Sequence, residues 1–294
     1  MKIISLLIVC AVLFAGCNSA IPTFDGEKAF KYLEEQCTFG PRNPGSEGHE
    51  LCKNYIIKFM EDHGAEVRTQ DFTASVRGDE FKFTNIIASY YPERPQRIFI
   101  GAHWDTRPWA DRDADSTKHN TPILGANDAA SGVAVLLELA TILQINEPPV
   151  YGYDLIFFDG EDAGSYGKTK NWCLGSQYFV EHYHGKEPEF VIVIDMIGDN
   201  ELEIKKEPFS LMSSPELVDR VWKIAKKNNL KGFSSKVTTY IYDDHYPFLE
   251  ASYDAIDIID LDYPYWHTTE DTPDKCSPKS LQSVGTMLMH LIYE

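Results

Sequence analysis

Imidazole and carboxylate side chains recur directly after predicted strands and at predicted helix starts. The set comprises His103, Asp105, Asp128, Glu161, Asp162, Asp195 and His267. Oxygen and nitrogen ligands without a thiolate are typical of a catalytic Zn²⁺ that keeps an open coordination position. One aspartate at a strand end is more often a helix cap, but caps do not explain the whole set. The sequence therefore predicts a metal site.

The central stretch of this set is Asp154 to Asp162. A short apolar run ends in Gly160 and is followed by two adjacent carboxylates, Glu161 and Asp162. The run is typical of a buried strand in a parallel sheet, and ligands in such sheets bind beyond the carboxyl ends of the strands. Taken alone, the two carboxylates fit a solvated turn equally well. The similar strand ends elsewhere favour the functional interpretation.

Hydrophobic patterns predict the elements that would position these residues. We expect strands at 67–75, 81–90, 97–101, 154–159, 189–196 and 255–261, and helices at 26–37, 50–63, 129–143, 215–228 and 281–293. Alternating strands and helices predict one doubly wound α/β domain, with a central, mostly parallel mixed sheet flanked by helices. The small residues after Asp128 would let a helix start approach the sheet closely. The charged insertion 107–122 fits either a lid or a surface loop.

Composition narrows the class of protein. The chain has 294 residues, 43% of them apolar, which is enough for an enzyme-sized core. Its formal net charge of −18 argues against nucleic-acid or anionic-membrane partners, because both are bound by basic patches.

The first residues predict export. Residues 1–16 combine a basic residue with a short apolar run and small residues before Cys17, as in a bacterial lipoprotein signal. We expect lipidated Cys17 to anchor a catalytic domain, 17–294, at the periplasmic or cell-envelope side of a membrane, with simple secretion as the alternative. Four further cysteines, which could pair in three ways, are Cys37, Cys52, Cys173 and Cys276.

The order His-x-Asp, Asn-Asp, Glu-Asp, Asp, His resembles the co-catalytic zinc aminopeptidase superfamily. Segments 159–161, 172–176, 243–248 and 266–267 make the chain look most like bacterial relatives of animal-type glutaminyl cyclases within that superfamily. The resemblance implies one zinc ion held by Asp128, Asp162 and His267. It also implies Glu161 as general acid/base, in a carboxylate network with Asp195 and Asp243.

The network is physically coherent, because crowded carboxylates cannot all ionise and one then holds a proton near neutral pH. Asp243 and Asp244 fit equally well as the start of a helix near Tyr246. Trp172 and Trp266 would wall a small dry pocket around the substrate side chain, or serve as core or rim residues. Cyclisation uses the substrate's own amine, so such a pocket would exclude competing water.

These inferences predict a glutaminyl-peptide cyclotransferase that converts N-terminal glutamine of peptides or proteins to pyroglutamate and releases ammonia. The alternative is an aminopeptidase with two zinc ions bridged by Asp128, in which His103 and Asp162 complete one ligand set and Asp195 and His267 the other. A third hypothesis is a catalytically silent metal-dependent binding protein, which would leave the general-base position without a use.

Overall fold

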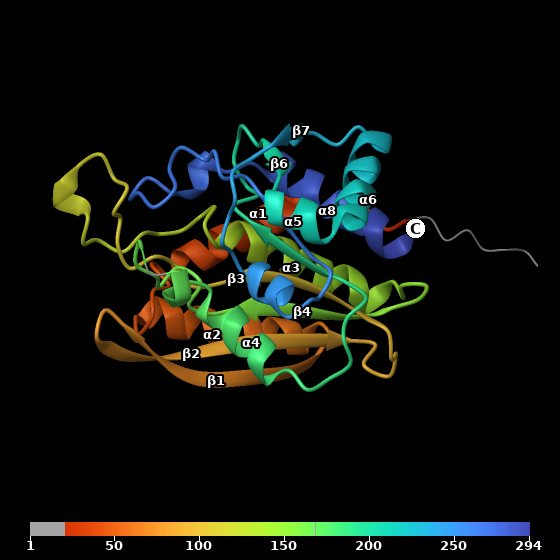
Figure 1. The fold of residues 1–294 in the computed structure, drawn as a ribbon, viewed down its shortest axis with the longest axis horizontal. Helices are drawn as coiled ribbons and strands as arrows, with labels where there is room; N and C mark the ends of the chain where they lie inside the picture. Colours follow the sequence, from red (N-terminus) through yellow and green to blue (C-terminus); the bar gives the residue numbers. More distant parts are fainter. Residues whose placement is uncertain (1–20, 168) are drawn as a thin grey trace, which may run out of the picture.

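A six-stranded sheet forms the centre of the computed structural model, which describes residues 21–167 and 169–294 (Figure 1). Its order is β1-β2-β4-β3-β5-β8. The strands are β1 (Glu66–Val76), β2 (Asp79–Tyr90), β3 (Arg97–His103), β4 (Gly152–Phe158), β5 (Val191–Asp195) and β8 (Ala255–Ile259). β4, β3, β5 and β8 run parallel, whereas β2 is antiparallel to both β1 and β4. This arrangement confirms the predicted mostly parallel mixed sheet.

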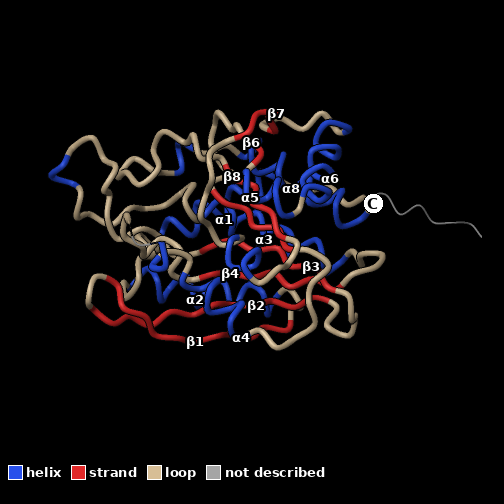
Figure 2. The backbone as a smooth tube through the Cα atoms, in the orientation of Figure 1, coloured by secondary structure: helices blue, strands red, loops and turns tan. Residues whose placement is uncertain are grey.

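Helices cover both faces of the sheet, with loops filling the periphery (Figure 2). They are α1 (Gly26–Thr38), α2 (Glu47–Asp62), α3 (Ala130–Ile145), α4 (Leu174–His182), α5 (Pro208–Ser213), α6 (Pro215–Lys227), α7 (Tyr246–Glu250) and α8 (Pro278–Tyr293). Successive residues of a strand point to opposite faces of the sheet, and therefore pack against different helices. Ile100, Leu155 and Ile192 pack with α1, α3, α6 and α8, whereas Phe99 and Ile156 pack with α4 and α7.

Helix α3 lies against the sheet and is apolar on nearly all sides, as expected for a helix buried in the interior. A side chain at Gly132 would lie 2.6 Å from the backbone oxygen of Ile194 in β5. Glycine therefore permits the close approach that the small residues after Asp128 predict. This contact places the start of α3 at the carboxyl end of the parallel strands.

Several short elements have no counterpart in the predicted set. They include α4, α5 and the parallel pair β6 (Ile204–Lys206) and β7 (Phe233–Val237), with 3₁₀ turns at Ser116–Lys118, Thr169–Asn171 and Pro273–Lys275. Short elements present too few residues for a clear apolar period, and β7 is largely exposed.

The predicted signal segment 1–16 and Cys17 lie outside the described residues. Cys37, Cys52, Cys173 and Cys276 are free thiols in the structure. Within the described ranges, no helix has the length and apolar character needed to cross a membrane.

Candidate metal centre

The carboxyl ends of the parallel strands carry the predicted chemistry. His103 is the last residue of β3, Asp195 is the last residue of β5, and Glu161 follows β4 after a glycine turn. Asp128 lies just before α3, whose start is adjacent to this edge. The fold thus brings residues from distant parts of the chain to the edge where α/β sheets bind ligands.

One group of side chains that could hold a metal ion consists of Asp128, Asp162 and His267. Their ligand atoms all lie within 4.8 Å of one another. His267 Nε2 is 3.0 Å from Asp162 Oδ1 and 3.6 Å from Asp128 Oδ2. Among the described residues, Asp128 Oδ2 and Asp162 Oδ2 are buried without a hydrogen-bond partner. Burying unpartnered carboxylate oxygens is costly, so this donor set fits a divalent cation such as zinc.

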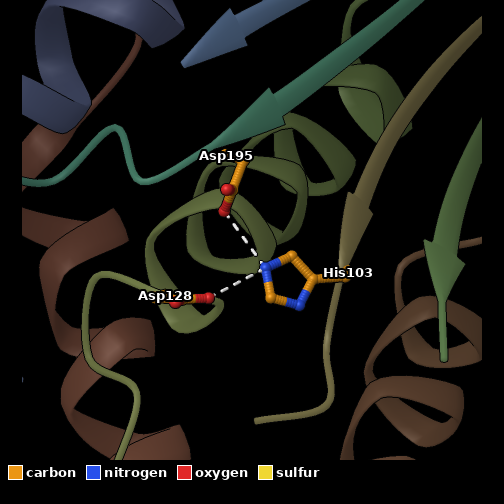
Figure 3. Close-up of side chains that lie close together, drawn as sticks. All are labelled: His103, Asp128 and Asp195. Atoms are coloured by element: carbon orange, nitrogen blue, oxygen red, sulfur yellow. Dashed lines mark hydrogen bonds and ion pairs between the residues drawn. The ribbon is translucent and has the colours of Figure 1, made fainter. Parts of the chain in front are cut away.

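A second group shares Asp128 with the first. His103 Nε2 lies 3.1 Å from Asp195 Oδ1 and 3.2 Å from Asp128 Oδ1, so the imidazole is held between two carboxylates (Figure 3). The ligand atoms of this group also lie within 4.8 Å of one another. The shared aspartate gives the site the layout of two adjoining candidate cation positions. The pairing predicted for two zinc ions is wrong, because His103 groups with Asp195 and Asp162 groups with His267.

Burial and neighbouring charges shift the pKa values of the carboxyl groups in the site in different directions. Burial acts to raise the pKa of Asp162, but His267 and Arg107 outweigh it and lower that pKa to about 2. Burial and the neighbouring Asp162 raise the pKa of Asp128 well above its usual range. Burial likewise raises the pKa of Glu161 far above its usual range, aided by Asp162 and Asp243 and opposed by His103. Glu161 is therefore suited to hold a proton near neutral pH.

Glu161 lies beside Asp243, one of the two partners predicted for its carboxylate network. Its ligand atom clusters with those of Cys173 and Asp243 within 4.8 Å. The Cys173 thiol donates to Glu161 Oε1 at 3.4 Å. Burial and the nearby Asp195 raise the pKa of Asp243 to about 6.

The paired aspartates at 243 and 244 differ in environment. Asp243 lines the cavity beside Glu161, whereas Asp244 accepts a hydrogen bond from Ser176 Oγ at 2.5 Å. Helix α7 does begin at Tyr246, but its N-cap residue is His245 and no side chain caps it. The interpretation of the two carboxylates as helix caps is therefore wrong.

Two aspartates support the loops that carry the candidate ligands, and one of them, Asp105, belongs to the set predicted from the sequence. Asp105 accepts hydrogen bonds from the backbone N–H groups of Glu161 and Asp162, at 3.0 and 3.2 Å. Asp271 accepts from the N–H groups of Asn127 and Asp128, at 2.9 and 3.2 Å. Sequence reasoning missed Asp271, because it lies more than a hundred residues from the loop it holds and carries no local motif.

Three non-glycine residues around the site have left-handed backbone conformations. Cys173, Met196 and His267 have φ values of 53°, 46° and 57°. Such conformations are costly for residues with a β-carbon and concentrate at functional sites.

A cavity of about 310 Å³ opens beside both groups, and Glu161, Asp195 and Asp243 line it together with the first group. Trp172 and Trp266 are also lining residues. The Trp172 ring lies parallel to the His267 ring at a centroid distance of 6.1 Å, and the Trp266 ring lies 4.1 Å from His267. The structure thus places both predicted tryptophans at the cavity wall.

The insertion 107–122 packs beside the site. Arg107 is buried and forms an ion pair with Asp111, and its Nη1 lies 3.5 Å from Asp162 Oδ1. The backbone N–H of Arg112 donates to the His267 carbonyl at 3.1 Å. These contacts make the beginning of the insertion part of the support for His267 and Asp162. No local motif marked Arg107 in the sequence.

This fold, with a shared aspartate between two buried ligand groups at the strand ends, defines a zinc-exopeptidase-like enzyme. Residues 85–292 match peptidase family M28, and the chain belongs to that family.

The solved structures to which this chain is similar include proteins named as glutaminyl cyclases and proteins named as aminopeptidases. A glutaminyl cyclase from Bacteroides thetaiotaomicron, solved with N-acetylhistamine, is 40% identical with a TM-score of 0.90, covering 94% of this chain and 99% of its own. A leucine aminopeptidase precursor from the same organism has the same identity, TM-score and coverage. Drosophila melanogaster glutaminyl-peptide cyclotransferase is 26% identical over 259 residues, which are 79% of this chain and 70% of the relative.

Proposed function

We propose that this protein is a zinc-dependent glutaminyl-peptide cyclotransferase that acts on peptides or proteins with N-terminal glutamine. The observation that carries the proposal is the buried Asp243 beside Glu161 at the cavity wall. A site that only activates water between two cations has no need of this additional carboxyl group. A general acid/base that accepts and returns a proton does benefit from such a neighbour.

In this proposal Asp128, Asp162 and His267 hold one zinc ion. The ion would supply Lewis-acid polarisation of the side-chain amide carbonyl of the substrate glutamine. The carboxylates of Asp105 and Asp271 keep these residues in place, because they accept hydrogen bonds from the backbone N–H groups of Asp162 and Asp128, respectively.

Glu161 carries the proton. The α-amine nitrogen of the substrate forms a bond to the side-chain amide carbon, and Glu161 accepts a proton from that nitrogen. The carboxyl group then returns the proton to the departing amide nitrogen, whose bond to carbon breaks to release ammonia. Asp195 and Asp243 stabilise the protonated form of this group through their charge.

The cavity wall orients the substrate and excludes water from it. Trp172 and Trp266 flank His267 and leave a small space. A glutamine side chain bound there would fold back on its own amine, which gives the proximity that ring closure requires. Exclusion of water protects the amide from hydrolysis.

The second candidate is a dinuclear aminopeptidase, favoured by the His103, Asp128 and Asp195 group in Figure 3. Zinc titration of the metal-free protein separates the candidates. Ammonia release from a peptide with N-terminal glutamine should reach its maximum at one zinc per chain. Removal of N-terminal residues that requires a second equivalent would contradict the cyclase assignment.

We further propose that Cys17 is lipidated and anchors the enzyme at the cell envelope. The lipoprotein-like residues before Cys17 support this location. Labelling of cells with an azido fatty acid should mark the wild-type protein but not the Cys17→Ser variant. Equal labelling of the two would contradict the anchor.

A further inference from the structure

An exposed apolar surface continues outward from the cavity. The most exposed large apolar side chains of the described residues are Leu51, Ile145, Val150, Tyr166, Met212, Val237 and Tyr240. Tyr240 is 59% exposed and lines the cavity. Its hydroxyl donates to the sulfur of Met212, which is 69% exposed, at 3.7 Å. Exposed apolar groups that adjoin a site indicate a binding surface.

Aromatic contacts make this surface continuous. The Phe209 ring lies 4.8 Å from the rings of both Tyr240 and Tyr246, and the Tyr246 ring lies 4.7 Å from that of Tyr242. Tyr242 also lines the cavity. We call these four aromatic residues together with Met212 the aromatic ledge.

The ledge is held in place by a buried carboxylate. Glu207 accepts hydrogen bonds from the N–H groups of Phe209 and Ile241, at 2.8 and 3.3 Å. It therefore ties α5, which carries Phe209 and Met212, to the segment that carries Tyr240 and Tyr242. A preformed surface of this kind loses little conformational entropy when a ligand binds.

We infer that the aromatic ledge binds the second and third residues of the substrate and selects apolar side chains there. This inference rests on the proposed function. A chain whose N-terminal residue occupies the cavity must place its next residues at the mouth, and each residue spans about 3.5 Å. Tyr240 and Tyr242 line the cavity and also belong to the ledge, and Met212 and Phe209 contact Tyr240.

The test compares two amidated peptides, Gln-Phe-Phe and Gln-Gly-Gly, by kcat/KM for pyroglutamate formation. Wild-type enzyme should favour the phenylalanine peptide by about fivefold, the factor expected when about half of one such side chain is buried. Met212→Ala and Tyr240→Ala should each reduce this ratio to about twofold or less.

Ile145→Ala is the matched control. Ile145 is 79% exposed and is the last residue of α3, which begins at the metal centre and extends for about 24 Å. Its removal deletes an exposed apolar side chain away from the ledge, so the ratio should stay at the wild-type value.

Three results would overturn the inference. Equal kcat/KM for the two peptides in the wild type would remove the ledge from substrate selection while leaving the proposed function intact. Absence of pyroglutamate from both peptides would contradict the proposed function itself. A dimer that light scattering finds dissociated by Met212→Ala, with an unchanged peptide ratio, would assign the surface to a second copy of the chain.

Discussion

Glu161 illustrates how the environment of one residue determines its chemistry. Its backbone N–H donates to Asp105, its carboxyl group receives a hydrogen bond from Cys173, and it faces the cavity. Its neighbours include both Asp162, which we propose as a zinc ligand, and Asp243, which the proposal leaves outside the ligand set. A carboxyl group with a raised pKa and access to substrate meets the requirements of a general acid/base.

Replacing Glu161 with glutamine should abolish proton transfer and preserve shape. We expect kcat for ammonia release to fall by about 10²- to 10⁴-fold, the usual contribution of general acid–base catalysis. Zinc content, measured by mass spectrometry of the metal, should remain that of the wild type. Activity within a few-fold of the wild type would assign the proton transfer to another group.

His267→Ala should lose metal, because this imidazole closes the group formed with Asp128 and Asp162. We expect the purified variant to hold little zinc and no measurable activity. His182→Ala is the matched control, since His182 is exposed and bonds only its own helix at the Tyr178 carbonyl. Full zinc occupancy in His267→Ala would remove His267 from the ligand set.

At the scale of elements, strand ends position His103, Glu161 and Asp195, and the start of α3 positions Asp128. The predicted strands at 97–101, 154–159 and 189–196 all exist within a few residues of their predicted bounds. Short continuous apolar runs bounded by glycine or charged residues made them recognisable in the sequence. Of the predicted ligands, Asp162 follows one of these strands, whereas Asp128 precedes α3 and His267 lies in the loop after β8.

Side chains that hold loops far from them in the sequence could not be predicted in the same way. Asp271 binds the loop at 127–128, and Glu207 joins α5 to Ile241. Neither residue has a periodic pattern or a motif, because its partner is brought near only by the tertiary fold. The short pair β6 and β7 also depends on neighbours rather than on local propensity.

The role of Asp271 in holding the loop at 127–128 can be tested by substitution. Asp271→Asn removes one of two acceptors for the N–H groups of Asn127 and Asp128. Zinc affinity should fall by about 10- to 100-fold, as for other groups that orient metal ligands. Asp274→Asn, which changes an exposed aspartate three residues away, should leave affinity unchanged. Equal affinities in both variants and the wild type would show that the loop holds its shape without Asp271.

At the scale of the whole molecule, the carboxyl groups of the candidate metal centre are concentrated in one place within a chain whose formal net charge is −18. Buried carboxylates repel one another, and a bound divalent cation relieves that repulsion. Metal binding is therefore coupled to the stability of the folded protein.

Removing zinc with a chelator should lower the melting temperature. Zinc restored at one hundred times its Kd should stabilise the fold by about 2.7 kcal/mol, which raises Tm by roughly 5 °C in a chain of this size. The His267→Ala variant should show no such recovery. An unchanged Tm in wild-type protein after complete chelation would contradict the coupling.

The fold, the Asp243 carboxyl group beside Glu161 and the aromatic cavity wall together support cyclisation of an N-terminal glutamine. The most direct test is the mass of a peptide with N-terminal glutamine after incubation with the zinc-loaded protein. We predict a product lighter by one ammonia molecule, with every residue retained. Loss of the whole N-terminal residue would contradict it and assign the site to an aminopeptidase.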